Sequence, residues 1–510
     1  MEEKNIKKQI ICPAGMRVSD YLIKIGMKSS LPCGGQGTCG NCKIRVFAGE
    51  LPVTETDKAF LSKQQLADNI RLACRAIPER PVRVGLINNG EDDIGVQGIP
   101  ENTAVCSKPD FSHEFGIAID IGTTTVAAAL VDITDGCIID TVSCINSQRP
   151  LGQDVISRLR SATSGNARLL KKLIEKDLIK LGEKFFIKQP EAYVKVRKIT
   201  IACNTVMSHI LLGYPCDGLA TAPFKPFSLA ESKLSPAELF TENDTSRIFS
   251  ENCVFDILPG IGPFAGSDIA AGLMKYGFAD DINDTAFIDL GTNSEIALIH
   301  DKTIYITAAA AGPAFEGGHI SCGIPGIPGA IKELSISDNK CYIKTIDDKM
   351  PEGICGTGIV SAVSSFLKNG IIDKTGKYND TYFLSGFTFY ENITLTQDDI
   401  REFQLAKGAI RAGLESLMKK AQITDINKLF IAGGFGTNLN PDDAVEIGLI
   451  PPGLNDKCTA VGNSSLEGAI AYLTDKESFK KINRVIDISE EINLANDSDF
   501  QSLYIKNMNF

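Results

Sequence analysis

Four cysteines near the N-terminus carry the pattern best suited to chemistry. Cys33, Cys39 and Cys42 stand at C-x5-C-x2-C spacing in L-P-C-G-G-Q-G-T-C-G-N-C, and Cys74 follows in R-L-A-C-R-A. Thiolates are soft ligands for iron, and one tight loop that gives three ligands with a distant fourth is typical of 2Fe–2S ferredoxins. A zinc site is the alternative, but such sites usually pair two short cysteine motifs, and only one is present here. We therefore expect these four cysteines to bind a 2Fe–2S cluster.

The same loop is rich in glycine. Gly34, Gly35, Gly37 and Gly40 allow sharp turns and bring backbone N–H groups towards the cluster sulfides, where side chains would not fit. The pattern predicts a loop that surrounds the cluster with backbone.

Two similar Asp-x-Gly-Thr turns follow much later in the chain. The first lies in F-G-I-A-I-D-I-G-T-T-T-V-A-A-A-L (115–130) and the second in T-A-F-I-D-L-G-T-N-S-E-I-A-L-I-H (285–300). In each, an apolar strand runs into a polar turn that leads to a second strand. Asp120 and Asp289 are 169 residues apart, which is long enough for one α/β domain. We therefore expect an internal duplication that gives two similar lobes.

Such turns bind phosphates without a Walker lysine. The glycine lets the backbone approach the oxygen atoms, while threonine hydroxyls and turn amides donate hydrogen bonds. An aspartate repels a phosphate, so it must act through Mg²⁺ or its waters. No G-x4-G-K-[ST] motif is present, so the sequence does not indicate a P-loop fold. The predicted phosphate-binding residues are Gly122, Thr123, Thr124, Thr125, Gly291, Thr292 and Asn293, with Asp120 and Asp289 ordering Mg²⁺ through water.

A third glycine-rich turn extends the predicted nucleotide site. It lies in L-F-I-A-G-G-F-G-T (429–437), again after an apolar strand. We expect Gly433, Gly434 and Gly436 to pass close to the nucleoside, because glycine allows close backbone approach.

Three acidic residues are candidates for catalysis. Asp289 or Glu295 is expected to orient the attacking water. Glu316, in G-P-A-F-E-G-G, is a candidate contact to the ribose or a contact made on closure. The alternative for Glu316 is a solvated loop acid.

Composition and charge limit the classes of partner. The chain has 510 residues and a formal net charge of −11, which argues against binding to nucleic acid or to anionic membranes. Its N-terminus lacks the apolar region of a signal peptide, and no apolar run approaches the length needed to span a bilayer. Eleven of the fifteen cysteines lie outside the cluster set, which in such a chain favours reduced thiols and a cytoplasmic location.

The coarse pattern predicts a small α+β module followed by an α/β region. Residues 1–87 alternate as strand 8–12, helix 18–23, strand 43–47, a helix capped by Thr56 or Asp57, and strand 81–87, which is β-grasp-like. Residues 88–113 form a polar, glycine-containing linker. The predicted domains are the ferredoxin-like module 1–87, the linker 88–113, a first lobe 114–284 and a second lobe 285–510.

The motifs also carry a resemblance. D-I-G-T-T-T, D-L-G-T-N-S-E, E-G-I-C-G-T-G-I-V (352–360) and I-A-G-G-F-G resemble the superfamily of acetate and sugar kinases, heat-shock chaperones and actin. With the ferredoxin module, the whole chain resembles the reductive activators of corrinoid proteins. Further stretches agree, namely A-C-N-T-V-M-S-H-I-L-L-G, A-A-G-P-A-F-E-G-G, R-E-F-Q-L-A-K-G-A-I-R-A-G and V-G-N-S-S-L-E-G-A.

The resemblance implies a fold and a function. The fold is a β-grasp 2Fe–2S domain followed by a two-lobed actin-like (ribonuclease H-like) ATPase, whose C-terminal part returns to the first lobe. The function is ATP-dependent transfer of one electron to an inactive Co(II) corrinoid protein, which regenerates Co(I) for methyl transfer. The implied cofactors are a 2Fe–2S cluster, ATP and Mg²⁺, and the implied partners are a corrinoid protein and an upstream electron donor.

Two departures from the family pattern stand out. Longer relatives have a middle domain between the ferredoxin and ATPase modules, where this chain has only the linker 88–113, so we expect a short form. Cys203 stands where a glycine is expected before Asn-Thr. The first departure leaves a homodimer open, and the second is explained by packing.

Other readings remain open from the sequence. A small-molecule kinase with a regulatory ferredoxin would need an acceptor pocket with a base, for which no signature stands out. An ATP-gated electron donor to a non-corrinoid enzyme and a chaperone-like module with a structural cluster are further alternatives. The four histidines are not spaced as a metal set, and His209 is expected to be a packed or interface side chain.

Overall fold

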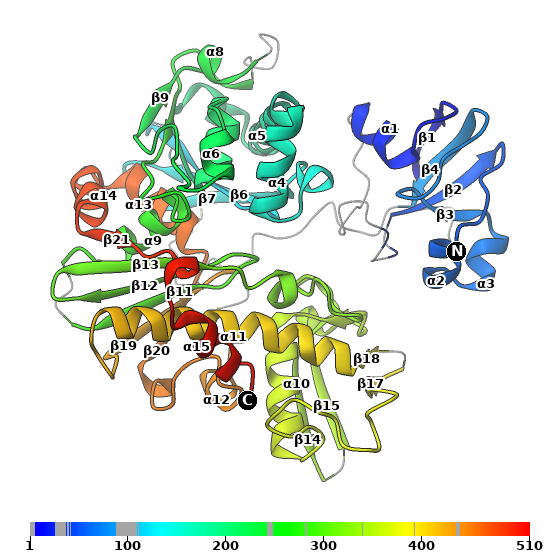
Figure 1. The fold of residues 1–510 in the computed structure, drawn as a ribbon. Coiled ribbons are helices and arrows are strands. Elements are labelled where there is room, and N and C mark those ends of the chain that lie inside the picture. Colours follow the sequence, from blue (N-terminus) through cyan, green and yellow to red (C-terminus); the bar gives the residue numbers. More distant parts are fainter. Residues whose placement is uncertain are drawn as a thin grey trace. The chain divides into compact units, whose positions relative to one another are not determined.

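The computed structural model describes residues 6–25, 37, 40, 42–87, 110, 112–241, 248–280, 283–338, 340–391, 393–434 and 439–510. The chain divides into two compact units (Figure 1), one with residues 1–94, 123–125 and 144–178 and one with residues 95–122, 126–143 and 179–510. Nearly all of the predicted linker 88–113 lies outside the described residues. Within the described ranges, no helix is long and apolar enough to cross a membrane.

The N-terminal module is a four-stranded antiparallel sheet with short helices. The sheet has the order β1-β4-β2-β3. Its buried core includes Val18, Leu22, Ile44, Leu72 and Val84, which come from α1 and from three of the strands. The elements are β1 (Ile6–Cys12), α1 (Val18–Lys24), β2 (Lys43–Ala48), α2 (Glu55–Phe60), α3 (Lys63–Ala67), β3 (Ile70–Leu72) and β4 (Val82–Ile87).

One predicted helix of this module is in fact two. Thr54 caps α2 and Ser62 caps α3, each with a reciprocal capping box. The prediction that Thr56 or Asp57 caps a single helix is wrong, because Thr54 caps the first helix, which ends at Phe60, and Ser62 then caps a second one.

Two six-stranded sheets repeat one pattern. In the first, the order is β7-β6-β5-β8-β10-β9, and in the second it is β21-β13-β12-β11-β19-β20. In both, an antiparallel hairpin (β5–β6 or β11–β12) lies beside two parallel strands (β8 and β10, or β19 and β20). This is the duplication that the two Asp-x-Gly-Thr turns predicted. The strands are β5 (Phe115–Ile121), β6 (Thr125–Asp132), β7 (Ile138–Ile145), β8 (Val196–Cys203), β9 (Ser232–Leu234), β10 (Val254–Ile257), β11 (Thr285–Asp289), β12 (Ser294–His300), β13 (Thr303–Ala309), β19 (Lys428–Ala432), β20 (Cys458–Gly462) and β21 (Ser489–Glu491).

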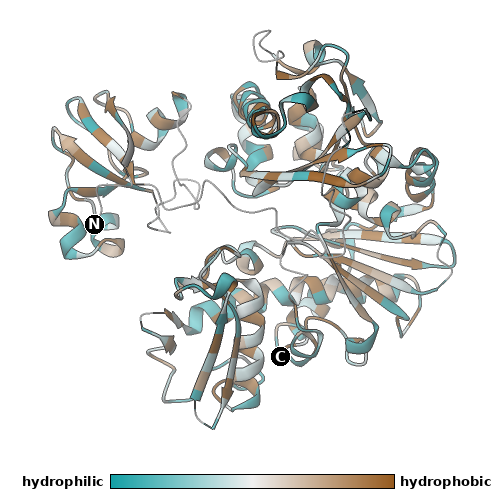
Figure 2. Cartoon of the chain, turned by 180° about the vertical axis from the view of Figure 1, so that it is seen from behind, coloured by the Kyte–Doolittle hydropathy of each residue, from teal (hydrophilic) through white to brown (hydrophobic). Residues whose placement is uncertain are grey.

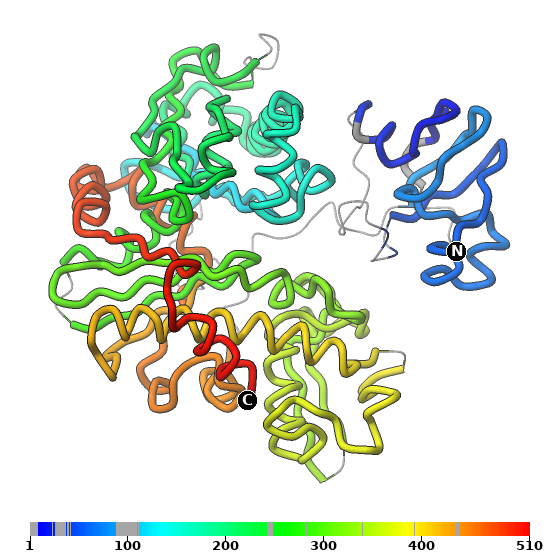
Figure 3. Tube along the Cα trace, viewed as in Figure 1, coloured from blue at the N-terminus to red at the C-terminus, as the bar shows by residue number. Residues whose placement is uncertain are grey.

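Helices and two small sheets complete the chain. The C-terminal helix α15 runs beside the long helix α11 (Figures 1 and 3). The helices are α4 (Val155–Ser161), α5 (Ala167–Lys188), α6 (Thr205–Leu212), α7 (Asp217–Ala220), α8 (Pro236–Leu239), α9 (Ser267–Lys275), α10 (Gly356–Lys368), α11 (Gln397–Lys420), α12 (Pro441–Glu446), α13 (Ser464–Thr474), α14 (Ser478–Asp487) and α15 (Phe500–Lys506). The small sheets contain β14 (Ala330–Ser337), β15 (Lys340–Thr345) and β16 (Gly353–Ile354), and β17 (Phe387–Tyr390) and β18 (Ile393–Leu395).

Helices α9 and α13 pack closely and share a core with both large sheets. This core contains side chains of β5, β6 and β8 from the first sheet and of β11, β12, β13 and β19 from the second. Apolar residues follow the strands, as Figure 2 shows. The helices approach so closely because Gly468 has no side chain: a Cβ there would lie 2.3 Å from the carbonyl oxygen of Ala271. On the facing helix, a Cβ on Gly272 would lie 2.9 Å from the hydroxyl of Ser464.

We predict that Gly468→Ala destabilises the chain. The added methyl group meets the backbone of α9, so the two helices must separate and loosen the shared core, at a cost of about 1–3 kcal/mol. Thermal unfolding followed by circular dichroism is the measurement. Gly260→Ala is the matched control, because its Cβ would meet the flexible end of Leu229 at 3.3 Å and the backbone of Gly266 no closer than 3.6 Å, an ordinary contact distance. Equal melting temperatures for the two variants would contradict the packing argument.

Candidate cluster and nucleotide sites

Two of the four predicted cluster ligands lie together in the N-terminal module. Cys42 directly precedes β2 and Cys74 follows β3, and the pairing of Lys43 with Leu72 places both cysteines at the same end of the sheet. The Cys74 N–H donates to the Sγ of Cys42 at 3.5 Å, and both thiols are buried. Cys33 and Cys39 lie outside the described residues.

The described glycines of the loop fit a cluster. Gly37 and Gly40 have positive φ angles of 77° and 66°, which favour glycine. A Cβ on Gly40 would lie 2.8 Å from the Cβ of Phe60, so no side chain fits at that position. Close backbone with an amide that points at a thiol is the environment that iron–sulfur clusters require.

Asp57 supports this end of the sheet, and the sequence analysis missed that role. Its buried carboxylate accepts hydrogen bonds from the Leu72 N–H and from the N–H and hydroxyl of Thr54, all at 2.8 Å. It therefore ties α2 to the strand that leads into Cys74. The signal available in the sequence was Thr-x-x-Asp, a capping-box pattern at residues 54–57.

The aspartates of the two hairpins meet at one helix N-terminus. Asp120 accepts hydrogen bonds from the side-chain amide of Asn463 at 2.9 Å and from the Ser465 hydroxyl at 2.8 Å. Asp289 accepts one from the Ser464 hydroxyl at 3.1 Å. Three consecutive residues at the start of α13 thus hold both carboxylates. The partial positive charge of a helix N-terminus also favours negative groups at this place.

Two further carboxylates, those of Asp268 and Glu295, interact electrostatically with Asp120 and Asp289. Burial, with the charges of Asp268 and Asp120, raises the pKa of Asp289 to about 7. Burial and the charge of Asp120 raise the pKa of Asp268 to about 7 as well. Burial and the charges of Asp268 and Asp289 raise the pKa of Glu295 well above its usual value. Glu295 faces Asp289 directly across the β11–β12 ladder. Burial raises the pKa of Asp120 as well, so four buried carboxylates with raised pKa values form a site suited to a cation.

The geometry fits a hydrated cation better than a directly coordinated one. In the part of the chain that the structure describes, one group of three or more metal-binding side chains has ligand atoms within 4.8 Å of one another: His113, Asp132 and Asp135. The four carboxylates of the hairpin site do not form such a set. Mg²⁺ keeps several of its waters and is often held through them, which suits carboxylates that do not form a compact ligand set.

The turn of the second hairpin is anchored to Glu316. The Thr292 hydroxyl donates to the Glu316 carboxylate, and the Thr292 carbonyl accepts from the Gly312 N–H at 3.0 Å. Glu316 is therefore a bonded, half-buried acid and not a freely solvated one. Gly291 and Asn293, on either side of Thr292, are half-buried as well.

The third glycine-rich turn lies against the second hairpin. Gly433 has a φ of 104°, and a Cβ there would lie 2.3 Å from the carbonyl oxygen of Leu290. The Leu290 N–H donates to Ala432, and the Gly433 N–H donates to Gly462. These residues stand at the carboxyl ends of the parallel strands β11, β19 and β20, where α/β sheets bind ligands. Gly434 follows in the described chain, while Gly436 lies outside the described residues.

The turn of the first hairpin is held by a buried arginine. Asp120 and Gly122 belong to one compact unit, and Thr123, Thr124 and Thr125 belong to the other. Within that other unit, the Arg158 guanidinium donates to the Thr123 carbonyl at 2.8 Å, and burial lowers the pKa of Arg158 to about 9. The Asn146 N–H donates to the Thr124 carbonyl at 2.9 Å.

Several of these residues were not predicted from the sequence. They are Asp268, Arg158 and the run Asn463–Ser465. Asp268 had a signal in G-I-G-P-F-A-G-S-D (260–268), a glycine-rich turn that follows an apolar strand and begins a helix. Asn463 had one too, as an N-cap residue before an apolar run. No sequence signal marked Arg158, because its hydrogen-bond partners are carbonyl groups, which no motif identifies.

Three other expectations have clear outcomes. His209 is a packed side chain, since its Nδ1 donates to the Thr205 carbonyl at 2.7 Å and its Nε2 accepts from the Phe227 N–H at 3.0 Å. Cys203 is fully buried at the end of β8, where it serves packing. Cys137 is disulfide-bonded, so the expectation of reduced thiols is wrong for that residue.

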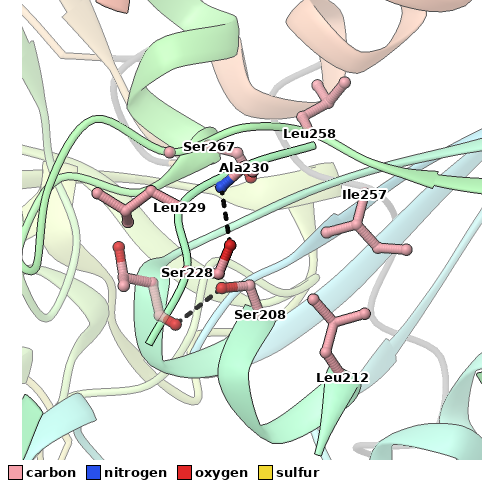
Figure 4. Close-up of a pocket in the computed structure, with 10 residues that line it drawn as sticks. Ser208, Leu212, Ser228, Leu229, Ala230, Ile257, Leu258 and Ser267 are labelled. Atoms are coloured by element: carbon pink, nitrogen blue, oxygen red, sulfur yellow. Dashed lines mark hydrogen bonds between the residues drawn. The ribbon is translucent and has the colours of Figure 1, made fainter. Parts of the chain in front are cut away.

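A small pocket near α6 contains none of the predicted site residues (Figure 4). Within it, the Ala230 N–H donates to the Ser228 hydroxyl and the Ser208 hydroxyl donates to the Thr205 carbonyl. Its polar atoms are thus bonded to the protein, and we assign it no part in the nucleotide site. It is lined by Thr205, Ser208, Leu212, Ser228, Leu229, Ala230, Ile257, Leu258, Gly260 and Ser267.

Comparison with known protein families shows which family this chain belongs to. A model described as a 2Fe-2S iron-sulfur cluster binding domain matches residues 2–79. A model described as the RACo middle region matches residues 115–281, and one described as the C-terminal domain of RACo, the ASKHA domain, matches residues 283–510. The chain belongs to the family of RACo-type reductive activators. Its fold is therefore the expected ferredoxin domain followed by an actin-like ATPase.

Individual relatives align over most of their length. The corrinoid activation enzyme RamQ of Eubacterium limosum is 29% identical over 580 residues, covering 97% of this chain and 96% of RamQ. The [Co(II) methylated amine-specific corrinoid protein] reductase of Methanosarcina barkeri is 25% identical over 433 residues, covering 78% and 77%. A solved reductive activator for corrinoid, iron-sulfur protein has a TM-score of 0.71 at 25% identity and covers 98% of this chain and 96% of that one.

The match to the RACo middle region bears on the expected short form. That region falls on residues 115–281, the segment that we assigned to the first lobe. The comparisons therefore give no support to the expectation that a middle domain is missing.

We predict that Asp57→Ala weakens cluster retention. It leaves the buried Leu72 N–H without its acceptor, which costs about 1–3 kcal/mol beside Cys74. Loss of the visible cluster absorbance in a urea titration of the anaerobic holoprotein is the measurement. Asp68→Ala is the control, because Asp68 accepts a single bond from Gln64 at 3.2 Å. If both variants lose the cluster absorbance at the same urea concentration, Asp57 does not support cluster retention.

We also predict that Mg²⁺ stabilises the chain more at high pH. A carboxyl whose pKa is raised in the folded state contributes stability below its unfolded pKa of about 4, and this contribution is lost as pH rises through about 7. Mg²⁺ competes with those protons, so its effect on the melting temperature grows between about pH 6 and pH 8. The measurement is the shift caused by MgCl₂ relative to NaCl of equal ionic strength. A shift independent of pH, or unchanged in Asp289→Asn, would contradict the site.

Proposed function

We propose that this chain is an ATP-dependent reductive activator that transfers one low-potential electron to an inactive Co(II) corrinoid protein and so regenerates Co(I) for methyl transfer. The observation that carries the proposal is the meeting of Asp120 and Asp289 at the start of α13, in a chain that also holds a ferredoxin domain. The names of its relatives support it, since they describe corrinoid activation and Co(II) corrinoid protein reduction.

The reaction needs ATP because the electron travels uphill. Plant-type 2Fe–2S centres lie near about −400 mV, and the Co(II)/Co(I) couple is expected to lie lower. Each gap of about 59 mV reduces the one-electron equilibrium constant tenfold. A bound cluster would supply the single electron. The protein must supply the coupling, by favouring a complex with the corrinoid protein in which reduction is easier.

We assign the residues as follows. Cys33, Cys39, Cys42 and Cys74 hold the cluster, and their surroundings shield it from water. Asp120 and Asp289 hold the waters of Mg²⁺, with Asp268 beside them. Asp289 or Glu295 orients the water that attacks the terminal phosphate. Phosphate oxygens accept from the first turn at Gly122, Thr123, Thr124 and Thr125 and from the second at Gly291, Thr292 and Asn293. The nucleoside lies along Gly433, Gly434 and Gly436.

Glu316 has a different proposed role from the other acids. Because it accepts from the Thr292 hydroxyl, it orients the turn that holds phosphate. We also assign Glu316 a direct contact with the ribose of the nucleotide.

Further partners belong to the same proposal. The cluster needs an upstream reductant of low potential, and the chain acts as a monomer or a homodimer in the cytoplasm. Eight described cysteines outside the cluster set are free thiols, Cys12, Cys203, Cys216, Cys253, Cys322, Cys341, Cys355 and Cys458, which supports a reducing compartment.

The proposal is tested with anaerobic protein. The reduced holoprotein is mixed with a Co(II) corrinoid protein, and Co(I) absorbance is followed with and without Mg-ATP. We expect Co(I) with Mg-ATP, no Co(I) from Cys42→Ser, and ATP hydrolysis reduced about a hundredfold or more in Asp289→Asn. Asp68→Ala serves as the unchanged control, because the Asp68 side chain accepts a hydrogen bond from Gln64 and belongs to neither site.

Two outcomes would replace the proposal. Absence of Co(I) with a cluster-loaded, ATP-hydrolysing wild type would indicate a non-corrinoid electron acceptor. ATP turnover that depends on a small alcohol or acid would indicate a kinase.

A further inference from the structure

The charge of the chain is unevenly distributed. Residues 1–87 contain fourteen Lys and Arg against eight Asp and Glu, a formal net charge of +6. The whole chain carries −11, so the other 423 residues carry −17. A basic module in an acidic chain is not required for folding. It is, however, the electrostatic condition for attracting an acidic partner.

One basic side chain lies on the cluster loop itself. Arg75 directly follows the predicted ligand Cys74 and is exposed. Its Nε lies 2.5 Å from the position that a Cβ on Gly37 would take, and its Nη2 lies 3.1 Å from it. Gly37 stands between the predicted ligands Cys33 and Cys39 in the sequence, so the guanidinium lies against a described residue of the loop that would hold the cluster.

Two apolar side chains of this module are exposed as well, one against the loop and one close to Arg75 in the sequence. Phe60, 43% exposed, contacts Gly40 on the other side of Cys39 in the sequence. Ile77, 52% exposed, is two residues from Arg75. We call Phe60, Arg75 and Ile77 the cluster-loop face. An arginine with an aromatic and an aliphatic neighbour is the composition typical of the energetic centre of a protein interface.

We propose that the cluster-loop face is the surface through which the ferredoxin domain docks an acidic surface of its electron acceptor. The proposal rests on the proposed function, since it names how that acceptor is recognised. Electron transfer requires a short distance to the cluster, so the side chains that cover the loop must lie in the contact. The positive charge of the module selects an acidic surface, and Phe60 and Ile77 supply its apolar centre. The presence of these apolar residues favours a protein over a nucleic acid.

The chain offers a matched control for Arg75. Arg83 is also an exposed arginine of the same module. It pairs with Ala48 and Ile11, whereas the cluster ligands lie at the Lys43 end of β2. Five residues of strand separate the two ends, or about 16 Å. Arg75→Glu and Arg83→Glu therefore make the same charge change near to and far from the loop.

The test measures the second-order rate of Co(I) formation from the reduced holoprotein and a Co(II) corrinoid protein, with Mg-ATP, as a function of NaCl. We expect the wild-type rate to fall with salt, and the Arg75→Glu rate at low salt to be about tenfold lower and nearly independent of salt. Arg83→Glu is expected to stay within about twofold of the wild type. The electron paramagnetic resonance spectrum and the reduction potential of each variant show whether the cluster is loaded and unchanged.

The outcomes separate this proposal from the proposed function. A wild type that forms no Co(I) overturns the function. A wild type that forms Co(I) while Arg75→Glu matches Arg83→Glu overturns the docking face. An effect of Arg75→Glu that is confined to the reduction potential, or to the first-order rate at saturating acceptor, also overturns it, because Arg75 then acts on the cluster or within the chain.

Discussion

The burial of like charges at the start of α13 is the constraint on which the nucleotide site depends. Burial raises the pKa of four carboxylates from two sheets and α9, and the charges of neighbouring acids add to this for Asp268, Asp289 and Glu295. The polar side chains of Asn463, Ser464 and Ser465 bond to two of the four, Asp120 and Asp289. Without a cation this arrangement is unfavourable when the acids are ionised. A site of this kind binds a divalent ion readily and responds strongly to its presence.

Helix α13 also explains how a change of charge at these carboxylates can affect both large sheets. α13 touches the aspartates of both hairpins at its first residues and packs against α9 along its length, where Gly468 permits backbone contact with Ala271. Closely packed helices move by small sliding steps that keep their side chains interlocked. A change of charge at Asp120 and Asp289 therefore acts directly on the helix pair that joins the cores of the two large sheets. In the proposed function, nucleotide bound at the hairpins therefore acts on both sheets through this helix pair.

Local patterns predicted much of the fold, and long-range partners account for the rest. Asp120 and Asp289 were found because a short motif occurs twice in similar strand–turn–strand contexts. The duplication predicted two similar lobes, whereas the number and order of the strands in each sheet came from the structure, because strand pairing depends on partners far apart in the sequence. Asp268 was missed although a glycine-rich turn precedes it, because that turn predicts the start of a helix and does not show that the carboxylate lies beside Asp120 and Asp289. Arg158 was missed for a similar reason, since a buried arginine that binds backbone carbonyls has no sequence signature.

The most direct test of this account is a double-mutant cycle on nucleotide affinity. Isothermal titration of a magnesium complex of a non-hydrolysable ATP analogue would compare the wild type, Asp120→Asn, Asp289→Asn and the double variant. If both aspartates serve one cation and one nucleotide, the two losses are non-additive, with a coupling free energy of about 0.5–3 kcal/mol. Additive losses, within about 0.3–0.5 kcal/mol, would show that the hairpins act independently and would contradict the account.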